Sequence, residues 1–92
     1  MEKAVLNMAD DFFEAVLKLE TKEECAKFFD DLCTMQELEA ISQRLEVAML
    51  LKDGKQYREI TEKTGASTAT ISRVSKCLRY GGGGYEIVLN RQ

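Results

Sequence analysis

Three basic side chains recur at intervals of three residues in the last third of the chain: Arg73, Lys76 and Arg79. Residues 67–80 contain no Asp or Glu. On a helix, residues three and four apart lie on one face, so these positions present guanidinium and ammonium groups without a neighbouring carboxylate. Such groups bind phosphate. The pattern favours a nucleic-acid partner, and a solvated helix face of ordinary composition is the alternative.

The residues just before this basic stretch are small and polar. At 100° per residue, Ala69 and Ser72 fall on the face that carries Arg73, while Thr68 and Thr70 lie near the predicted start of the helix. Small side chains allow a helix to enter the DNA major groove, and the dipole at a helix N-terminus favours phosphate. The face predicts a DNA-binding helix; an αα-hairpin with a polar outer face is the alternative.

Residues suited to catalysis or to metal binding are scarce. The chain has no histidine, and its three cysteines, Cys25, Cys33 and Cys77, form no CxxC pair. The usual general base and zinc ligand set are therefore missing, and no serine or cysteine stands beside a recognisable activating partner. The sequence predicts a protein that is not an enzyme, with no metal site and no cofactor. Its cysteines are expected to be reduced and mostly buried.

Charged residues are divided unevenly along the chain. Residues 1–53 contain 6 Lys/Arg and 13 Asp/Glu, a balance of −7, whereas residues 54–92 contain 7 and 3, a balance of +4. The net charge of −3 conceals this difference. A split of this kind fits a C-terminal half that meets a polyanion and an acidic half that faces elsewhere, and a solvated surface of mixed charge is the equal alternative.

The composition fits a single folded domain over residues 1–92. With 45% hydrophobic and 32% charged residues, the chain is too hydrophobic for disorder. Its longest uninterrupted apolar run covers residues 47–51, far short of the roughly 20 residues of a membrane span. Its first residues lack the pattern of a signal peptide. We therefore expect a cytoplasmic protein that does not enter a membrane.

The spacing of apolar residues predicts an all-α multi-helix bundle. Proline is absent, and no strand-like alternation precedes residue 85. Capping boxes of the form S/T-x-x-E open two of the helices, at Thr21 and at Thr34. Gly54 supplies the left-handed residue that ends the longest helix. The expected helices cover residues 3–19, residues 22–32, the segment from the Thr34 box to Gly54, residues 57–64 and residues 68–79.

The last residues of the sequence depart from this regular pattern. Residues 81–84 are four consecutive glycines, whose backbone entropy disfavours a helix, so a loop is expected there. The tail at residues 85–92 fits either a short helix or an added strand, and the pattern does not distinguish the two.

The apolar stripes of the first three helices exceed what one small chain can cover. A chain of this length buries only about 60 to 65% of its extended surface, and large exposed apolar patches mark interfaces. Residues 1–53 are therefore expected to form the core and dimerisation helices of a homodimer. The residues expected to face inward are Phe12, Phe13, Val16, Phe28, Phe29, Leu32, Leu38, Ile41, Leu45, Ala48 and Met49.

Residues 57–79 combine two short predicted helices across a three-residue turn. Gly65 is the first turn residue, where reversal of the chain requires a positive φ. Ile60 of the first helix is expected to face a stripe of the second helix at spacings of three and four, made of Ile71, Val74 and Leu78. This is the arrangement of a helix-turn-helix.

Residues 65–73 read Gly-Ala-Ser-Thr-Ala-Thr-Ile-Ser-Arg and closely resemble the GA-x-x-ATI-[ST]-R motif of the Trp-repressor-like family. The likeness covers roughly residues 30–80, and the Arg-Tyr-Gly-rich ending is similar to the YerC/YecD branch of that family. Upstream positions that fall in register with its central helices are Thr34, Glu37, residues 39–41, Arg44 and residues 57–60, with one inserted residue around residues 52–54.

The resemblance implies an intertwined homodimer that binds a pseudo-palindromic double-stranded DNA site and acts as a transcriptional repressor. It also implies that water mediates part of the base readout. Two departures are visible: Gln56 is a poorer N-cap than Ser or Thr, and the family's final long helix must be shortened or missing. The implied base-facing residues are Ser67, Thr68, Ala69, Thr70, Ser72 and Arg73, and the implied DNA-backbone anchors are Arg58, Lys76 and Arg79.

The resemblance also implies where a tryptophan corepressor would bind. It places Thr34, Arg44 and Arg73 at the family's ligand pocket, but the next residue, Val74, is glycine in the family pattern. Valine adds three carbons where the indole ring would lie, and its branched side chain has little rotamer freedom in a helix. We therefore expect a vestigial pocket, formed by Thr34, Arg44 and Val74, that does not bind tryptophan.

The alternative function is a helical protein-interaction module without DNA binding. In this hypothesis the acidic N-terminal helices dock a basic partner, and the second motif helix packs on protein. A DNA titration at low salt separates the two hypotheses, because DNA binding predicts an affinity that falls steeply as salt is added.

Overall fold

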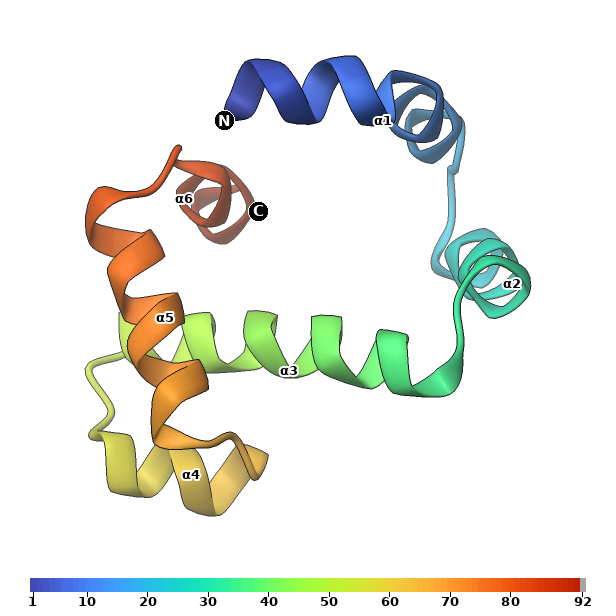
Figure 1. The fold of residues 1–92 in the computed structure, drawn as a ribbon. Helices are drawn as coiled ribbons and strands as arrows, with labels where there is room; N and C mark the ends of the chain where they lie inside the picture. Colours follow the sequence, from blue (N-terminus) through green and yellow to red (C-terminus); the bar gives the residue numbers. More distant parts are fainter. Residues whose placement is uncertain (92) are drawn as a thin grey trace. The chain divides into compact units, whose positions relative to one another are not determined.

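The computed structural model describes residues 1–91, which form six α-helices and no strand (Figure 1). The prediction of an all-α fold is confirmed. Among the helices of these residues, none has the length and the hydropathy of a membrane span. The helices are α1 (Glu2–Leu17), α2 (Lys22–Leu32), α3 (Met35–Lys52), α4 (Tyr57–Thr64), α5 (Thr68–Tyr80) and α6 (Gly84–Asn90).

The helix boundaries lie close to those predicted from the sequence. α2 and α4 occupy the predicted residues, α5 continues one residue further, to Tyr80, and α1 ends two residues earlier, at Leu17. The tail, left open between helix and strand, is the helix α6. The glycine loop predicted over residues 81–84 is one residue too long, because Gly83 caps α6 with a φ of 87° and Gly84 is already helical.

Threonine side chains begin α2 and α3, as the capping boxes predict. In α2, Glu24 N donates to Thr21 Oγ1 (3.0 Å), while the Glu24 carboxylate accepts from Glu20 N (2.8 Å) instead of from Thr21. In α3 the exchange is reciprocal: Glu37 N donates to Thr34 Oγ1 (3.1 Å) and Thr34 N donates to Glu37 Oε1 (2.8 Å). These bonds satisfy amides that have no partner within the helix.

The cap of α3 makes folding stability depend on the charge of Glu37. Hydrogen bonds from the backbone and side chain of Thr34 hold the pKa of Glu37 below its ordinary value. The ionised carboxylate therefore stabilises the folded chain above the unfolded-state pKa, and this effect is lost as pH falls through the folded-state pKa. In urea unfolding we expect Glu37→Gln to be less stable than the parent at neutral pH and equally stable in acid. A difference that persists unchanged in acid would contradict this.

The N-terminal unit (Met1–Leu38) is one of two compact units in the chain. Ring centroids of Phe12 on α1 and of Phe28 and Phe29 on α2 lie 5.4 to 6.3 Å apart, in offset and edge-on pairs that attract each other. Neither helix contains a fully buried residue. Leu32, predicted to face inward, is 52% exposed, because two short helices cannot enclose their own apolar faces. The single domain over residues 1–92 stays a prediction.

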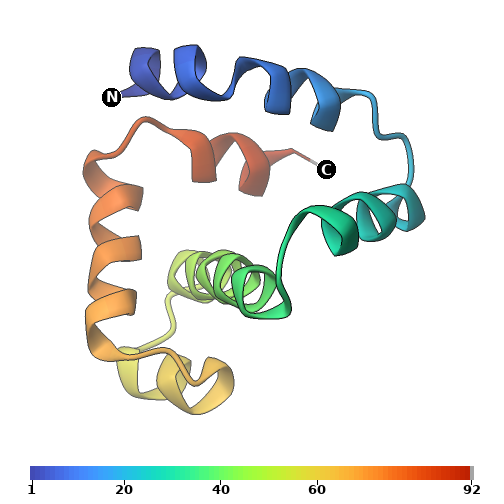
Figure 2. The same ribbon diagram turned by 45° about the vertical axis from the view of Figure 1, so that its right-hand side comes forward.

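The C-terminal unit, which begins at Glu39, contains the buried core of the described residues. Within this unit α5 leads from α4 to α6 (Figure 2). Ile60 of α4 and Ile71 and Val74 of α5 are at most 2% exposed, so the predicted inward faces of the two motif helices are confirmed. The core residues are Val47, Ala48, Ile60, Ala66, Ile71 and Val74, with Leu50, Leu51, Leu78, Tyr85 and Leu89 packed around them.

Helix α3 has apolar side chains on two faces, and the predicted stripe included only part of them. Val47, which the stripe omitted, is fully buried beside Ala48 in the core of the helix-turn-helix. Ile41, Leu45 and Met49, predicted to face inward, are instead 53%, 38% and 49% exposed. They recur every four residues and so form a continuous line along the helix. In the part of the chain that the structure describes, this apolar line is exposed.

Candidate nucleic-acid interface

Helix α5 begins at a serine that was expected to face DNA bases. Ser67 is the N-cap of α5: its Oγ accepts from Thr70 N (3.1 Å) and donates to Thr70 Oγ1 (3.1 Å). A serine cap typically stabilises a helix by about 1 kcal/mol. Ser67 therefore stabilises the first turn of α5. This structural role could have been inferred from the sequence, because a serine directly before a predicted helix is a typical N-cap.

The turn between α4 and α5 is tied to α3 by side chains that the motif did not reveal. Gly65 adopts the predicted positive φ, 75°, and a Cβ there would meet no neighbour, so conformation and not space requires glycine. Thr64 Oγ1 donates to Ile60 O (2.8 Å) and accepts from Ala66 N (3.1 Å). Gln43 Nε2 on α3 donates to Thr64 O (3.1 Å). The turn is thereby held against the longest helix.

One face of α5 is exposed and carries most of the predicted contact residues. Ile71 and Val74 turn the opposite face into the core. Within residues 1–91, no carboxylate lies in ion-pair distance of Arg73, Lys76 or Arg79, so their positive charges are available to an external anion. The exposed predicted residues are Ser67, Thr68, Ala69, Ser72, Arg73, Lys76 and Arg79, whereas Thr70 is partly buried.

The remaining predicted anchor, Arg58, lies on α4. Its Nε is 3.5 Å from Glu62 Oε1, and the side chain is 92% exposed. An exposed pair of this spacing contributes only about 0.3 to 0.5 kcal/mol, so a phosphate can replace Glu62 with little loss. Lys63 of α4 pairs with Glu59 at 3.2 Å, and Lys55, which precedes the helix, lies 3.9 Å from the same carboxylate. The positive charges of α4 are therefore compensated within the helix, unlike those of α5.

A cavity of about 240 Å³ opens along α5. Val74, expected to occupy the former ligand space, is 2% exposed and belongs to the core, and the cavity lies beside it. Tyr85 of α6 also lines the cavity. The sequence did not predict this position, because the tail fitted either a helix or a strand. Thr34, also assigned to the vestigial pocket, lies in the N-terminal unit, where its hydroxyl caps α3. The cavity is lined by Arg44, Ala69, Thr70, Arg73, Val74, Cys77 and Tyr85.

The cysteines are unpaired thiols and are less buried than predicted. Cys25 and Cys33 are partly buried, but Cys77 is exposed, so the prediction of burial is wrong for this residue. The physical reason is that α5 buries only the narrow side that contains Ile71 and Val74, and Cys77 lies outside it at the cavity.

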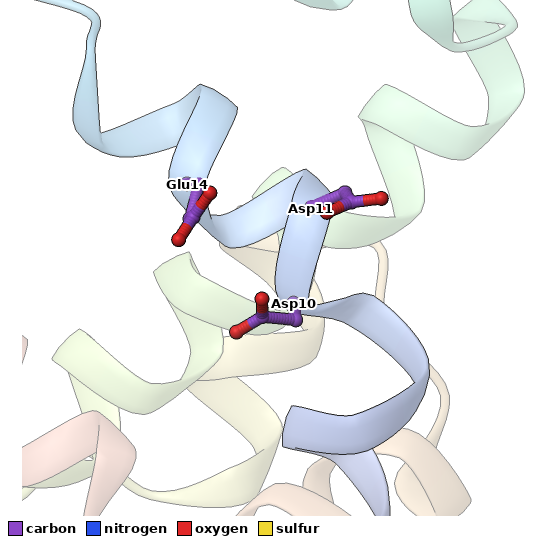
Figure 3. Close-up of side chains that lie close together, drawn as sticks. All are labelled: Asp10, Asp11 and Glu14. Atoms are coloured by element: carbon purple, nitrogen blue, oxygen red, sulfur yellow. The ribbon is translucent and has the colours of Figure 1, made fainter.

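Three carboxylates gather on α1: those of Asp10, Asp11 and Glu14 (Figure 3). One oxygen from each lies within 4.8 Å of the others, and all three side chains are exposed. Exposed acidic groups of this kind are common without an ion, and these belong to the acidic half of the chain. The absence of a metal site stays a prediction.

Similarity to known proteins extends over nearly the whole chain. The family described as Trp repressor protein matches residues 7–92. The chain belongs to the Trp repressor family. It is 54% identical over 82 residues to the protein YerC of Bacillus subtilis, a match that spans 89% of this chain and 79% of YerC.

Two solved structures support the assignment to the Trp repressor family. A Trp repressor candidate from Staphylococcus aureus is 49% identical, with a TM-score of 0.90 over 98% of this chain and 90% of that chain. A TrpR-like protein from Eubacterium eligens is 45% identical, with a TM-score of 0.91 over 99% and 94% of the two chains. The predicted family is confirmed, and the likeness extends beyond residues 30–80 to include α1 and α6.

The Trp repressor family consists of helix-turn-helix regulators that bind DNA, and the family is non-enzymatic. The exposed basic face of α5 is the surface of this chain that fits such a regulator.

Proposed function

We propose that the chain is a homodimeric transcriptional repressor that binds a specific double-stranded DNA sequence through α5. The observation that carries the proposal is the exposed face of α5, where Arg73, Lys76 and Arg79 have no carboxylate partner in the part of the chain that the structure describes. The other side of α5 is anchored in the core. A helix held in this way is suited to the DNA major groove. Because a repressor must reach the DNA that it binds, we propose a cytoplasmic location.

The proposed DNA contacts fall into two groups, contacts to bases and contacts to phosphate. Short residues at the start of α5 contact bases at close approach or through water, whereas Arg73 is long enough to form two hydrogen bonds to a guanine edge. Contacts to phosphate set the position of the helix and supply most of the salt-dependent affinity. The proposed base contacts are Ser67, Thr68, Ala69, Thr70, Ser72 and Arg73, and the proposed phosphate contacts are Arg58, Lys76 and Arg79.

The proposed homodimer is supported by the apolar surface that one chain leaves uncovered. α3 exposes the line of Ile41, Leu45 and Met49, and neither α1 nor α2 contains a buried residue. A second copy of the chain is the proposed cover, because exposed apolar patches of this kind mark interfaces. Two-fold symmetry then pairs two α5 helices with a pseudo-palindromic site whose half-site centres lie about 34 Å apart.

Selection from a library of random duplexes tests the proposed function. The full chain is mixed with the library, and the bound duplexes are sequenced. We expect enrichment of two inverted half-sites with centres about 10 base pairs apart. Enrichment of one isolated half-site would contradict a dimer on DNA, and no enrichment over the input would contradict sequence-specific binding.

We further propose that tryptophan does not regulate this DNA binding. Val74 is buried in the core at the edge of the cavity, where the family pattern has glycine, so its side chain occupies space that an indole ring would need. Calorimetry with L-tryptophan is expected to show no heat of binding, and the affinity for DNA should not change. Saturable binding by the parent would contradict the proposal, whereas a gain of binding in Val74→Gly alone would support it.

A further inference from the structure

Helix α6 folds back onto the core of the C-terminal unit. The chain turns at Gly81, where a Cβ atom would lie 2.4 Å from the carbonyl oxygen of Cys77, so only glycine permits this close approach. Tyr85 and Leu89, one helical turn apart, then pack against the buried residues. The seven residues of α6 therefore form an ordered side of this unit.

Polar contacts connect α6 to the end of α3. Lys52 Nζ lies 3.5 Å from Glu86 Oε2 and donates a hydrogen bond to Asn90 Oδ1. Asn90 Nδ2 in turn donates to Glu86 Oε2 (3.1 Å). Each of these exposed contacts is weak, but together with the packing of Tyr85 and Leu89 they hold α6 against both α3 and α5.

Tyr85 stands where α6 meets the proposed DNA-binding helix. Its ring lines the same cavity as Arg73 and Val74 of α5. Val74 is also the last buried residue of α5, since Leu78 is only partly buried. Beyond Val74, Leu78 of α5 packs around the core together with Tyr85 and Leu89 of α6.

We propose that α6 braces α5 against α3, and that Tyr85 is the positioning residue that holds Arg73 at the angle needed for base readout. This inference rests on the proposed function. When the Tyr85 ring is present, α5 can tilt about its buried residues only until the cavity closes against that ring. When the ring is absent, α5 gains freedom that must be lost again on the specific site, which lowers affinity. Binding to random DNA depends on phosphate contacts and tolerates a looser helix.

Tyr85→Ala in the full chain tests this inference, with Tyr85→Phe and Tyr80→Ala as matched controls. Tyr85→Phe keeps the ring, and Tyr80→Ala removes a ring that is 80% exposed. We expect Tyr85→Ala to lower affinity for the selected duplex by about tenfold, within the range of coupling effects measured in proteins, while its affinity for random duplex stays nearly unchanged. Both controls should keep the parent's ratio of specific to random affinity.

Amide hydrogen exchange in the absence of DNA is a second measurement of how firmly α5 is held. We expect the α5 amides of Tyr85→Ala to exchange faster than in the parent, while those of α4 do not. An unchanged ratio of specific to random affinity, together with unchanged exchange of the α5 amides, would overturn the inference. An equal loss of affinity for both duplexes, accompanied by a general loss of folding stability, would overturn it as well. If the parent binds no duplex, the proposed function fails, and the exchange rates alone decide whether Tyr85 holds α5.

Discussion

Replacing Arg73 with alanine is expected to lower affinity for the selected duplex by about 5- to 150-fold, which corresponds to about 1 to 3 kcal/mol for a lost bidentate base contact. The side chain is exposed on α5, and no carboxylate in residues 1–91 pairs with it, so its loss should not unfold the protein. Fluorescence anisotropy with the selected duplex and with each single-base variant measures the effect. One base position should become tolerant of substitution.

Lys76→Ala provides the comparison, because a phosphate contact carries no sequence information. We expect this variant to weaken binding to all duplexes alike and to reduce the salt dependence. Lys27 is an exposed residue of α2, and the variant Lys27→Ala should bind DNA as the parent does. Ile71→Ala should lose about 2 to 5 kcal/mol of stability, because Ile71 is fully buried. If Arg73→Ala and Lys76→Ala both bind normally, the DNA-facing side of the helix has been misassigned.

Leu45→Lys is expected to convert the proposed homodimer to a monomer. Leu45 lies at the centre of the exposed apolar line of α3, between Ile41 and Met49. A lysine there would bury an unpaired charge in the interface, which costs several kcal/mol or displaces the partner. Sedimentation equilibrium at micromolar concentration should report twice the mass of the chain for the parent and the mass of one chain for the variant.

Glu39→Lys is the control for this experiment. It introduces the same side chain on α3, but at an exposed position away from the apolar line, and it should remain dimeric. A parent protein that sediments only as a single chain would contradict the homodimer directly. A Leu45→Lys variant that stays dimeric would show that the second copy binds elsewhere.

The local structure of this chain was accessible from its sequence because short-range rules determine it. The Thr34 box predicted a hydrogen-bond exchange that the structure contains, and Gly65 predicted a left-handed turn residue. Ile60, Ile71 and Val74 were identified as inward-facing from spacing alone, and all three are buried. The exposed face of α5 follows from these buried positions, so most of the candidate site could also be predicted.

What the sequence did not reveal depends on contacts between distant elements. The pattern of α3 contains apolar residues on two sides, and spacing alone does not say that the helix-turn-helix covers Val47 while Leu45 stays exposed. Tyr85 lies in a tail that fitted a helix or a strand, so its place at the cavity beside α5 could not be derived. Gln43, a polar residue within a helix, gave no sign of its hydrogen bond to Thr64.

A salt titration of DNA binding by the parent chain tests the central proposal most directly. If Arg58, Lys76 and Arg79 of both protomers all reach phosphate, the logarithm of the binding constant should fall with the logarithm of salt with a slope of roughly −5. The proposed function predicts tight binding to the selected duplex at low salt and a steep fall of this order. No binding at low salt, or binding that does not change with salt, would contradict DNA recognition and favour a protein-interaction module.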